Sequence, residues 1–161
     1  QDYTGAVTEL HVDGDPAHPG FNNFSGSILK QNGNNLGERM HYALDRAFAT
    51  HTSVVLIGSD CPGIDYHYLD SAFTALDDGF NAVLGPAEDG GYVLIGLRND
   101  VSDKSADLFR DISWGTDTVS AQTRNLFQKL DLTWKELPVL QDLDEPSDLE
   151  TLSREFRFLQ G

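Results

Sequence analysis

The chain has 161 residues, of which 39% are hydrophobic, so it can bury one sizeable core and a second domain is not expected. Its 26 acidic and 11 basic residues give a formal net charge of −15, which argues against nucleic acids and anionic membranes as partners. No apolar run is long enough for a membrane span, and no signal peptide is visible. The single cysteine, Cys61, fits a reducing compartment, so we expect a soluble, cytoplasmic protein.

The first half of the chain predicts two strands and one helix. Residues 6–12 are expected to form a strand, followed by a surface loop rich in glycine, proline and asparagine. Apolar residues at helical spacing predict a helix over residues 36–50, and Asn35 with Glu38 can form its N-terminal capping box. The apolar run at residues 54–58 lacks polar alternation, which is typical of a strand covered on both faces.

The second half continues the alternation of helices and strands. The expected elements are a helix over residues 66–78 with Asp65 as its cap and Gly79 at its end, strands at 81–86 and 91–97, a helix from about 116 to 130, a strand at 137–142 and a C-terminal helix that opens at Pro146. This order predicts an α/β fold, with one mostly parallel sheet flanked by helices, in a single domain over residues 1–161.

Acidic residues follow three of the expected strands. Asp60 follows the strand at 54–58, Asp89 lies between the next two strands, and Asp142 with Asp144 follow the last one. Open α/β sheets bind ligands beyond the carboxyl ends of their strands, where Mg²⁺ or Mn²⁺ could be held between Asp60 and the later pair. The alternative, that Asp60 only caps the turn, stays open.

The stretch GPAEDGGY, residues 85–92, places three glycines around two carboxylates. Such a loop lets backbone N–H groups approach a ligand closely, although a plain glycine-bearing hairpin has the same sequence pattern. No phosphate-loop, dinucleotide or kinase motif is present, and the histidines lack zinc-ligand spacing. A nucleophilic role for Cys61 would need an activating histidine, and His67 is close only in sequence.

Five blocks, taken in order, resemble a known bacterial family. They are NNLGERM (34–40), VVLIGSDCPG (54–63), GPAEDGGYVLIGL (85–97), LFRDISWGTDTV (108–119) and LDEPSDL (143–149). They are similar to the radical-SAM/selenodomain-associated transferases, a domain of unknown function in the nucleotide-diphospho-sugar transferase superfamily. That resemblance implies a GT-A-like, Rossmann-like fold, similar to molybdenum-cofactor guanylyltransferases and phospholactate guanylyltransferase.

The resemblance also implies roles for individual residues. These are Asp60 with Asp142 or Asp144 as metal ligands, Asp60 and Asp89 as catalytic carboxylates, Gly37 and Arg39 near the nucleotide, Gly90 and Gly91 on the sugar or acceptor side, and Trp114 and Thr116 as another wall of the site. Members of the family usually open with a strand and a basic loop of the form K-x-P-x-x-G-x-x-K-T-R, which cradles the nucleotide. Nothing here matches that loop, so we expect the sequence to be N-terminally incomplete or to have lost part of its donor site.

The function expected from this resemblance is metal-dependent glycosyl or nucleotidyl transfer. The donor would be a nucleotide or nucleotide-diphospho-sugar, the acceptor an unknown small molecule, and the cofactor Mg²⁺ or Mn²⁺. An alternative is a non-catalytic binding or scaffold module that retains the transferase fold, and a hydrolase is a third interpretation. Without the basic loop, we expect residues 1–161 to bind UDP- or GDP-sugars no better than roughly millimolar.

Overall fold

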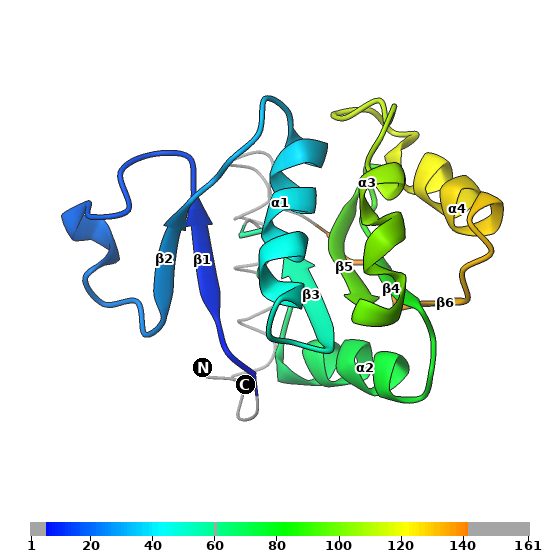
Figure 1. Cartoon of the computed structure of the whole chain (residues 1–161), viewed down its shortest axis with the longest axis horizontal. Helices are drawn as coiled ribbons and strands as arrows, with labels where there is room; N and C mark the ends of the chain where they lie inside the picture. The colour runs from blue at the N-terminus through cyan, green and yellow to red at the C-terminus, as the bar shows by residue number, and fades with distance from the viewer. Residues whose placement is uncertain (1–5, 60, 142–161) are drawn as a thin grey trace, which may run out of the picture.

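The computed structural model describes residues 6–59 and 61–141 of the chain (Figure 1). Its strands are β1 (Glu9–Val12), β2 (Ser27–Lys30), β3 (Ser53–Ile57), β4 (Ala82–Pro86), β5 (Tyr92–Arg98) and β6 (Trp134–Glu136). Its helices are α1 (Leu36–Phe48), α2 (Tyr66–Asp77), α3 (Ser105–Leu108) and α4 (Val119–Lys129), with short 3-10 helices η1 (Pro19–Phe21) and η2 (Asn99–Lys104). The strands and helices alternate as predicted, and the α/β fold class is confirmed.

The strands form two sheets rather than the single sheet that the pattern predicted. The larger sheet has the order β3-β5-β4-β6, and β1 pairs with β2 in a separate parallel pair. In the larger sheet β3, β4 and β6 run in one direction and β5 runs in the other. Two of its three strand pairings are therefore antiparallel, and the sheet is mixed rather than mostly parallel as predicted. The two sheets lie on either side of α1 in Figure 1, with β1 and β2 in blue.

The helices α1 and α2 begin where local sequence signals predict. The Asn35 side chain accepts the N–H of Glu38 at 2.9 Å, and the Asp65 side chain accepts the N–H of Tyr68 at 2.8 Å. Gly79 follows α2 with φ of +102°, a backbone conformation that glycine adopts without strain. Among residues 6–59 and 61–141, no helix has the length and apolar character needed to cross a membrane.

Each face of the larger sheet packs against its own apolar cluster. On one face Val54 and Leu56 contact the cluster that includes Leu44 of α1 and Phe127 of α4. On the other face Val55 contacts the cluster of α2. Successive side chains of β3 therefore enter different cores, which explains why this strand is apolar without alternation.

The structure differs from the prediction at short elements. β2 lies inside the stretch that was predicted to be loop, and η2 with α3 fills residues 99–108, where no helix was predicted. The last described strand is β6 at Trp134–Glu136, not 137–142 as predicted. The helix predicted from Pro146 lies outside the described residues.

β6 lies earlier in the sequence than predicted because its side chains are anchored to α4. The Trp134 ring centroid lies 5.5 Å from that of the buried Phe127. Arg124 of α4 makes a two-pronged ion pair with Glu136, through Nε to Oε1 at 2.5 Å and a terminal nitrogen to Oε2 at 3.1 Å. This hydrogen-bonded guanidinium holds the pKa of Glu136 below its usual value.

Candidate functional site at the carboxyl ends of the strands

β3 and β4 end at the same edge of the larger sheet, because both run antiparallel to β5, which lies between them. The chain after β6 returns to this edge, where Leu140 bridges Ala87 and its carbonyl accepts the Glu88 N–H at 3.1 Å. The first turn of α1 and the loop of residues 109–118 lie at the same, upper end of Figure 1. Ligands of open α/β sheets bind beyond this edge, so we consider it the candidate site.

The turn that joins β4 to β5 is held by its own hydrogen bonds and by α4. Asp89 Oδ1 accepts the Gly91 N–H at 2.7 Å, and Ala87 O accepts the Gly90 N–H at 3.3 Å. Ser120 holds the other side, since its N–H donates to Gly90 O at 2.9 Å and its hydroxyl to Gly91 O at 2.5 Å. The glycine N–H groups are therefore used inside the turn, and the side chains of Glu88 and Asp89 are exposed to solvent.

Three aromatic rings pack over the start of α1. The ring centroid of Trp114 lies 6.3 Å from that of Tyr92 and 6.4 Å from that of Phe109. Gly37 lies against this cluster, where a Cβ would come within 2.7 Å of Phe109 O and 3.0 Å of the Trp114 ring. The structure thus brings Gly37 and Trp114 together, and the absence of a side chain at residue 37 lets the Trp114 ring approach the helix.

The turn with Asp89 lies next to the loop that carries Trp114. A Cβ on Gly90 would be 2.1 Å from the carbonyl oxygen of Asp117, so the two backbones are in direct contact. Thr116, which precedes Asp117, donates its hydroxyl hydrogen to Ser113 O at 2.8 Å and stabilises the loop before α4. These predicted residues of the turn and the loop therefore form one continuous surface.

The guanidinium of Arg39 is already engaged by other groups of the protein. Its Nε donates to Gly33 O at 3.3 Å, one terminal nitrogen donates to Gln31 Oε1 at 3.0 Å, and the same nitrogen lies 3.3 Å from a carboxylate oxygen of Asp13. The guanidinium stabilises the segment between β2 and α1. Its predicted proximity to a nucleotide stays a prediction, which would require these contacts to be shared or exchanged.

The predicted metal ligands Asp60, Asp142 and Asp144 lie outside the described residues. Their neighbours along the chain do contact each other, because the Cys61 thiol donates to the carbonyl oxygen of Gln141 at 3.4 Å. Leu140 also lies close to Gly63, where a Cβ would be 3.3 Å from its side chain. In the described part of the chain, no group of three or more His, Cys, Asp or Glu side chains is placed to hold a metal ion.

A family model matches the part of the chain that carries most of this surface. Residues 5–116 match the family described as "Uncharacterized protein conserved in bacteria (DUF2064)". The chain belongs to this family. The match includes the turn with Asp89 and the loop with Trp114, whereas the segment with Asp142 and Asp144 follows it. No protein of curated function matches this DUF2064 sequence.

Solved structures show the same fold in the DUF2064 chain and in nucleotide-handling proteins. A candidate nucleotide-diphospho-sugar transferase from Desulfovibrio desulfuricans G20 is 35% identical over 86% of this chain, with a TM-score of 0.77. This chain spans only 62% of that protein's length. A CMP:2-keto-3-deoxy-manno-octonic acid synthetase solved with CTP matches 94% of this chain and 81% of its own, at 9% identity and a TM-score of 0.66. The chain therefore has a nucleotidyl- or glycosyltransferase-like fold.

Tyr68 is a residue of the DUF2064 chain that the sequence did not single out. Its hydroxyl donates to Pro138 O at 2.8 Å, and Gly85 leaves room for it, since a Cβ there would be 2.5 Å from the hydroxyl oxygen. Burial, together with the nearby Cys61, raises the pKa of Tyr68 to about 12. Neither Tyr68 nor Ser120 carries a local sequence signal, because the partner of each lies far away along the chain. Tyr68 ties the segment of residues 137–141 to α2.

Tyr68→Phe is expected to lower the free energy of unfolding by about 1 kcal/mol, because Pro138 O loses its donor. Tyr42→Phe, at an exposed position of α1, is the matched control and should cost almost nothing.

Folding raises the Tyr68 pKa from 10 to about 12. The stability that the neutral Tyr68 hydroxyl gives the wild type is therefore complete below pH 10 and is lost between pH 10 and 12. Urea denaturation across that range measures both effects, and the loss should be smaller in the variant. Burial also raises the pKa of Tyr92, so part of the loss remains. Equal pH dependence in the two proteins would contradict the assignment.

Proposed function

We propose that this protein is a metal-dependent transferase that acts on a nucleotide or nucleotide-diphospho-sugar donor. The observation that carries the proposal is the contact between Cys61 and Gln141, because it joins the immediate neighbours of Asp60 and Asp142 at the edge where α/β folds bind ligands. The transferase-like fold supports the same conclusion. Asp60 and the pair Asp142 and Asp144 are the proposed ligands of Mg²⁺ or Mn²⁺.

Carboxylate oxygens are the ligands that Mg²⁺ takes from proteins, usually one or two at a site where phosphate and water fill the rest. When bound, the metal would neutralise the charge that develops on the leaving phosphate. A metal is needed because the protein carries a net charge of −15 and Arg39 is already engaged by Asp13 and Gln31. The negative field would otherwise repel the donor.

The described residues supply a surface for the rest of the substrate. Trp114, packed on Gly37, offers an aromatic wall against which a base or sugar ring can lie. Asp89 is exposed beside it, with one carboxylate oxygen fixed by the Gly91 N–H. In this proposal the second oxygen accepts the proton of the acceptor hydroxyl as that hydroxyl attacks the donor.

Magnesium titration with a matched pair of variants tests the metal ligands. Asp60→Asn should weaken Mg²⁺ binding in the presence of CTP or a UDP-sugar by at least about tenfold, since a charged ligand becomes neutral. Asp78→Asn changes the charge equally, at the exposed C-cap of α2, and should leave binding unchanged. Calorimetry measures both affinities. Equal Mg²⁺ binding by wild type and Asp60→Asn would remove Asp60 from the site.

A second candidate function is a non-catalytic module that keeps the fold and binds a nucleotide without turnover. The engagement of Arg39 by other groups favours it, because its guanidinium is then already used within the protein and not offered to the phosphates of a donor. Asp89→Asn separates the two candidates, since the amide oxygen can still accept the Gly91 N–H while the base is lost. If the protein is a transferase, Asp89→Asn should lower donor turnover and leave the Mg²⁺ affinity unchanged. If it is a binding module, the wild type itself should show no turnover with any donor of a nucleotide panel.

A further inference from the structure

Ser120 is a buried residue of α4 whose side chain serves the turn between β4 and β5. It is the second residue of the helix, it is only 4% exposed, and its hydroxyl bonds to a residue 29 positions away. Serine side chains at the start of a helix commonly bond to nearby backbone groups of their own segment. The Ser120 hydroxyl donates instead to Gly91 O, so its contribution is made to the turn that carries Asp89.

The peptide group between Gly90 and Gly91 connects Ser120 to Asp89. Its carbonyl oxygen accepts the N–H of Ser120 at 2.9 Å, and its N–H donates to Asp89 Oδ1 at 2.7 Å. The C=O and N–H of a trans peptide point in opposite directions, so this peptide lies between the helix and the carboxylate. The orientation of one peptide group therefore determines whether Asp89 Oδ1 is held.

The positive end of α4 is directed at the same carboxylate. The first N–H groups of a helix lack partners inside the helix and carry a partial positive charge. The Ser120 N–H is one of them, and it reaches the Asp89 carboxylate through the peptide. Consecutive hydrogen bonds in such a chain polarise and strengthen one another.

This peptide group would rotate easily if nothing held it. The two dihedral angles that turn it are ψ of Gly90 and φ of Gly91, and glycine is the residue least restricted in both. Ser120 restrains the peptide on two sides, because its N–H bonds to Gly90 O and its hydroxyl bonds to Gly91 O at 2.5 Å. A rotated peptide would lose the bond from the Ser120 N–H and the bond to Asp89 together.

We propose that Ser120 is the positioning residue of Asp89 and acts through the peptide between Gly90 and Gly91. The proposal rests on the proposed transferase function, in which Asp89 is the base. The fixed Oδ1 leaves Oδ2 as the oxygen that takes the proton. In that reaction the O–H bond of the acceptor breaks and its proton passes to Oδ2. The acceptor oxygen bonds to the donor, and the bond to the leaving phosphate breaks with its electron pair.

Ser120→Ala tests the role by separating kcat from KM. Alanine is well tolerated in a helix, and the variant loses the hydroxyl while it keeps the N–H. For donor turnover, kcat should fall about fivefold, which corresponds to one hydrogen bond. The KM for the donor and the Mg²⁺ affinity should stay within about twofold, because the effect falls on the base alone.

A second substitution shows whether Ser120 acts through Asp89. In the Asp89→Asn protein the base is already lost, so Ser120→Ala should lower kcat no further. A purely structural role of Ser120 would lower kcat by the same factor in both backgrounds. That result would overturn the proposal.

Ser105 offers the matched control. It is also buried, only 1% exposed, and its hydroxyl donates to a backbone carbonyl, Ser102 O, at 2.7 Å. Ser105→Ala therefore removes the same kind of hydrogen bond at the start of α3 and should leave kcat unchanged. Equal falls in kcat for Ser105→Ala and Ser120→Ala would contradict the assignment.

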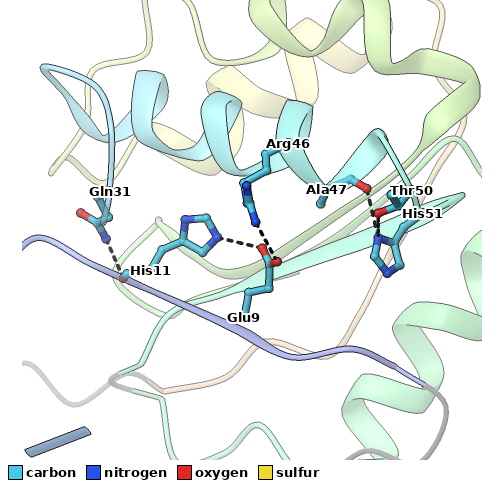
Figure 2. A network of polar contacts seen from close by, with 7 residues as sticks. All are labelled: Glu9, His11, Gln31, Arg46, Ala47, Thr50 and His51. Atoms are coloured by element: carbon cyan, nitrogen blue, oxygen red, sulfur yellow. Dashed lines mark hydrogen bonds and ion pairs between the residues drawn. The ribbon is translucent and has the colours of Figure 1, made fainter. Parts of the chain in front are cut away.

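Figure 2 shows the location of a second control, in the last turn of α1. Arg46 lies 3.6 Å from the Glu9 carboxylate and so links α1 to β1. Arg46→Gln removes this ion pair and tests whether loosening α1, whose first turn carries Gly37, is enough to lower turnover. It should leave kcat unchanged. A fall in kcat as large as that of Ser120→Ala would contradict a specific role for Ser120.

Amide hydrogen exchange measured by NMR gives a readout that needs no donor. In Ser120→Ala the Gly91 N–H should exchange about fivefold faster than in the wild type, because its peptide rotates more often. The amides of residues 93–97 in β5 should exchange as before. Unchanged exchange at Gly91, or equal acceleration along β5, would overturn the role of Ser120. Absence of turnover in the wild type would instead contradict the proposed transferase function, and the exchange at Gly91 would still decide whether Ser120 holds the peptide.

Discussion

Gly90→Ala is expected to destabilise the protein by about 3 to 4 kcal/mol. Gly90 has φ of +89°, and the added Cβ would lie 2.1 Å from the carbonyl oxygen of Asp117. The left-handed conformation alone costs an alanine about 1 to 2 kcal/mol, and the contact with backbone cannot be relieved by rotating a side chain. Either the turn or the loop before α4 has to move.

Gly115→Ala is the matched control for this prediction. Gly115 also has a positive φ, +76°, but a Cβ there meets nothing within 4 Å. This variant should therefore lose only the conformational part, about 1 to 2 kcal/mol. Urea denaturation of both variants measures the difference, which reports the contact between Gly90 and Asp117. Equal losses in the two variants would mean that the turn and the loop are not in contact.

Phe127→Ala should cost about 3 to 5 kcal/mol, because its fully buried ring fills the cluster between α4 and the larger sheet. The ring also packs against Trp134, so part of the loss comes from weaker anchoring of β6. Leu126→Ala on the same helix removes a partly buried side chain and should cost clearly less. The order of the two losses in urea denaturation is the measured quantity. A larger loss for Leu126→Ala would contradict the packing described for α4.

The elements that the sequence predicted are those with local determinants. The N-terminal ends of α1 and α2 depend on Asn35 and Asp65, each of which accepts a hydrogen bond from the N–H three residues later. β2 and β6 are only four and three residues long, and their positions depend on partners far along the chain. A short strand with a distant partner leaves no periodic pattern to detect.

The candidate site likewise combines features that have local sequence signals with contacts to residues far away along the chain. The turn with Asp89 was predicted from its glycines, but its anchor Ser120 is a helix residue whose partner lies 29 positions away. Arg39 was assigned from its motif, and the motif does not contain Asp13, the carboxylate that lies beside its guanidinium. The metal ligands Asp60, Asp142 and Asp144 stay predictions, because they lie outside the described residues.

The contact between Cys61 and Gln141 also gives the protein a built-in reporter. Cys61 is the chain's single thiol, it is only 7% exposed, and it donates to the backbone of residue 141. A thiol reagent can therefore modify the protein at one position, and only after this contact opens. When opening is fast and reversible, the modification rate is the chemical rate multiplied by the fraction of molecules open. The labelling rate, divided by the chemical rate, thus gives the free energy of the opening that exposes Cys61, which is at most the free energy of global unfolding.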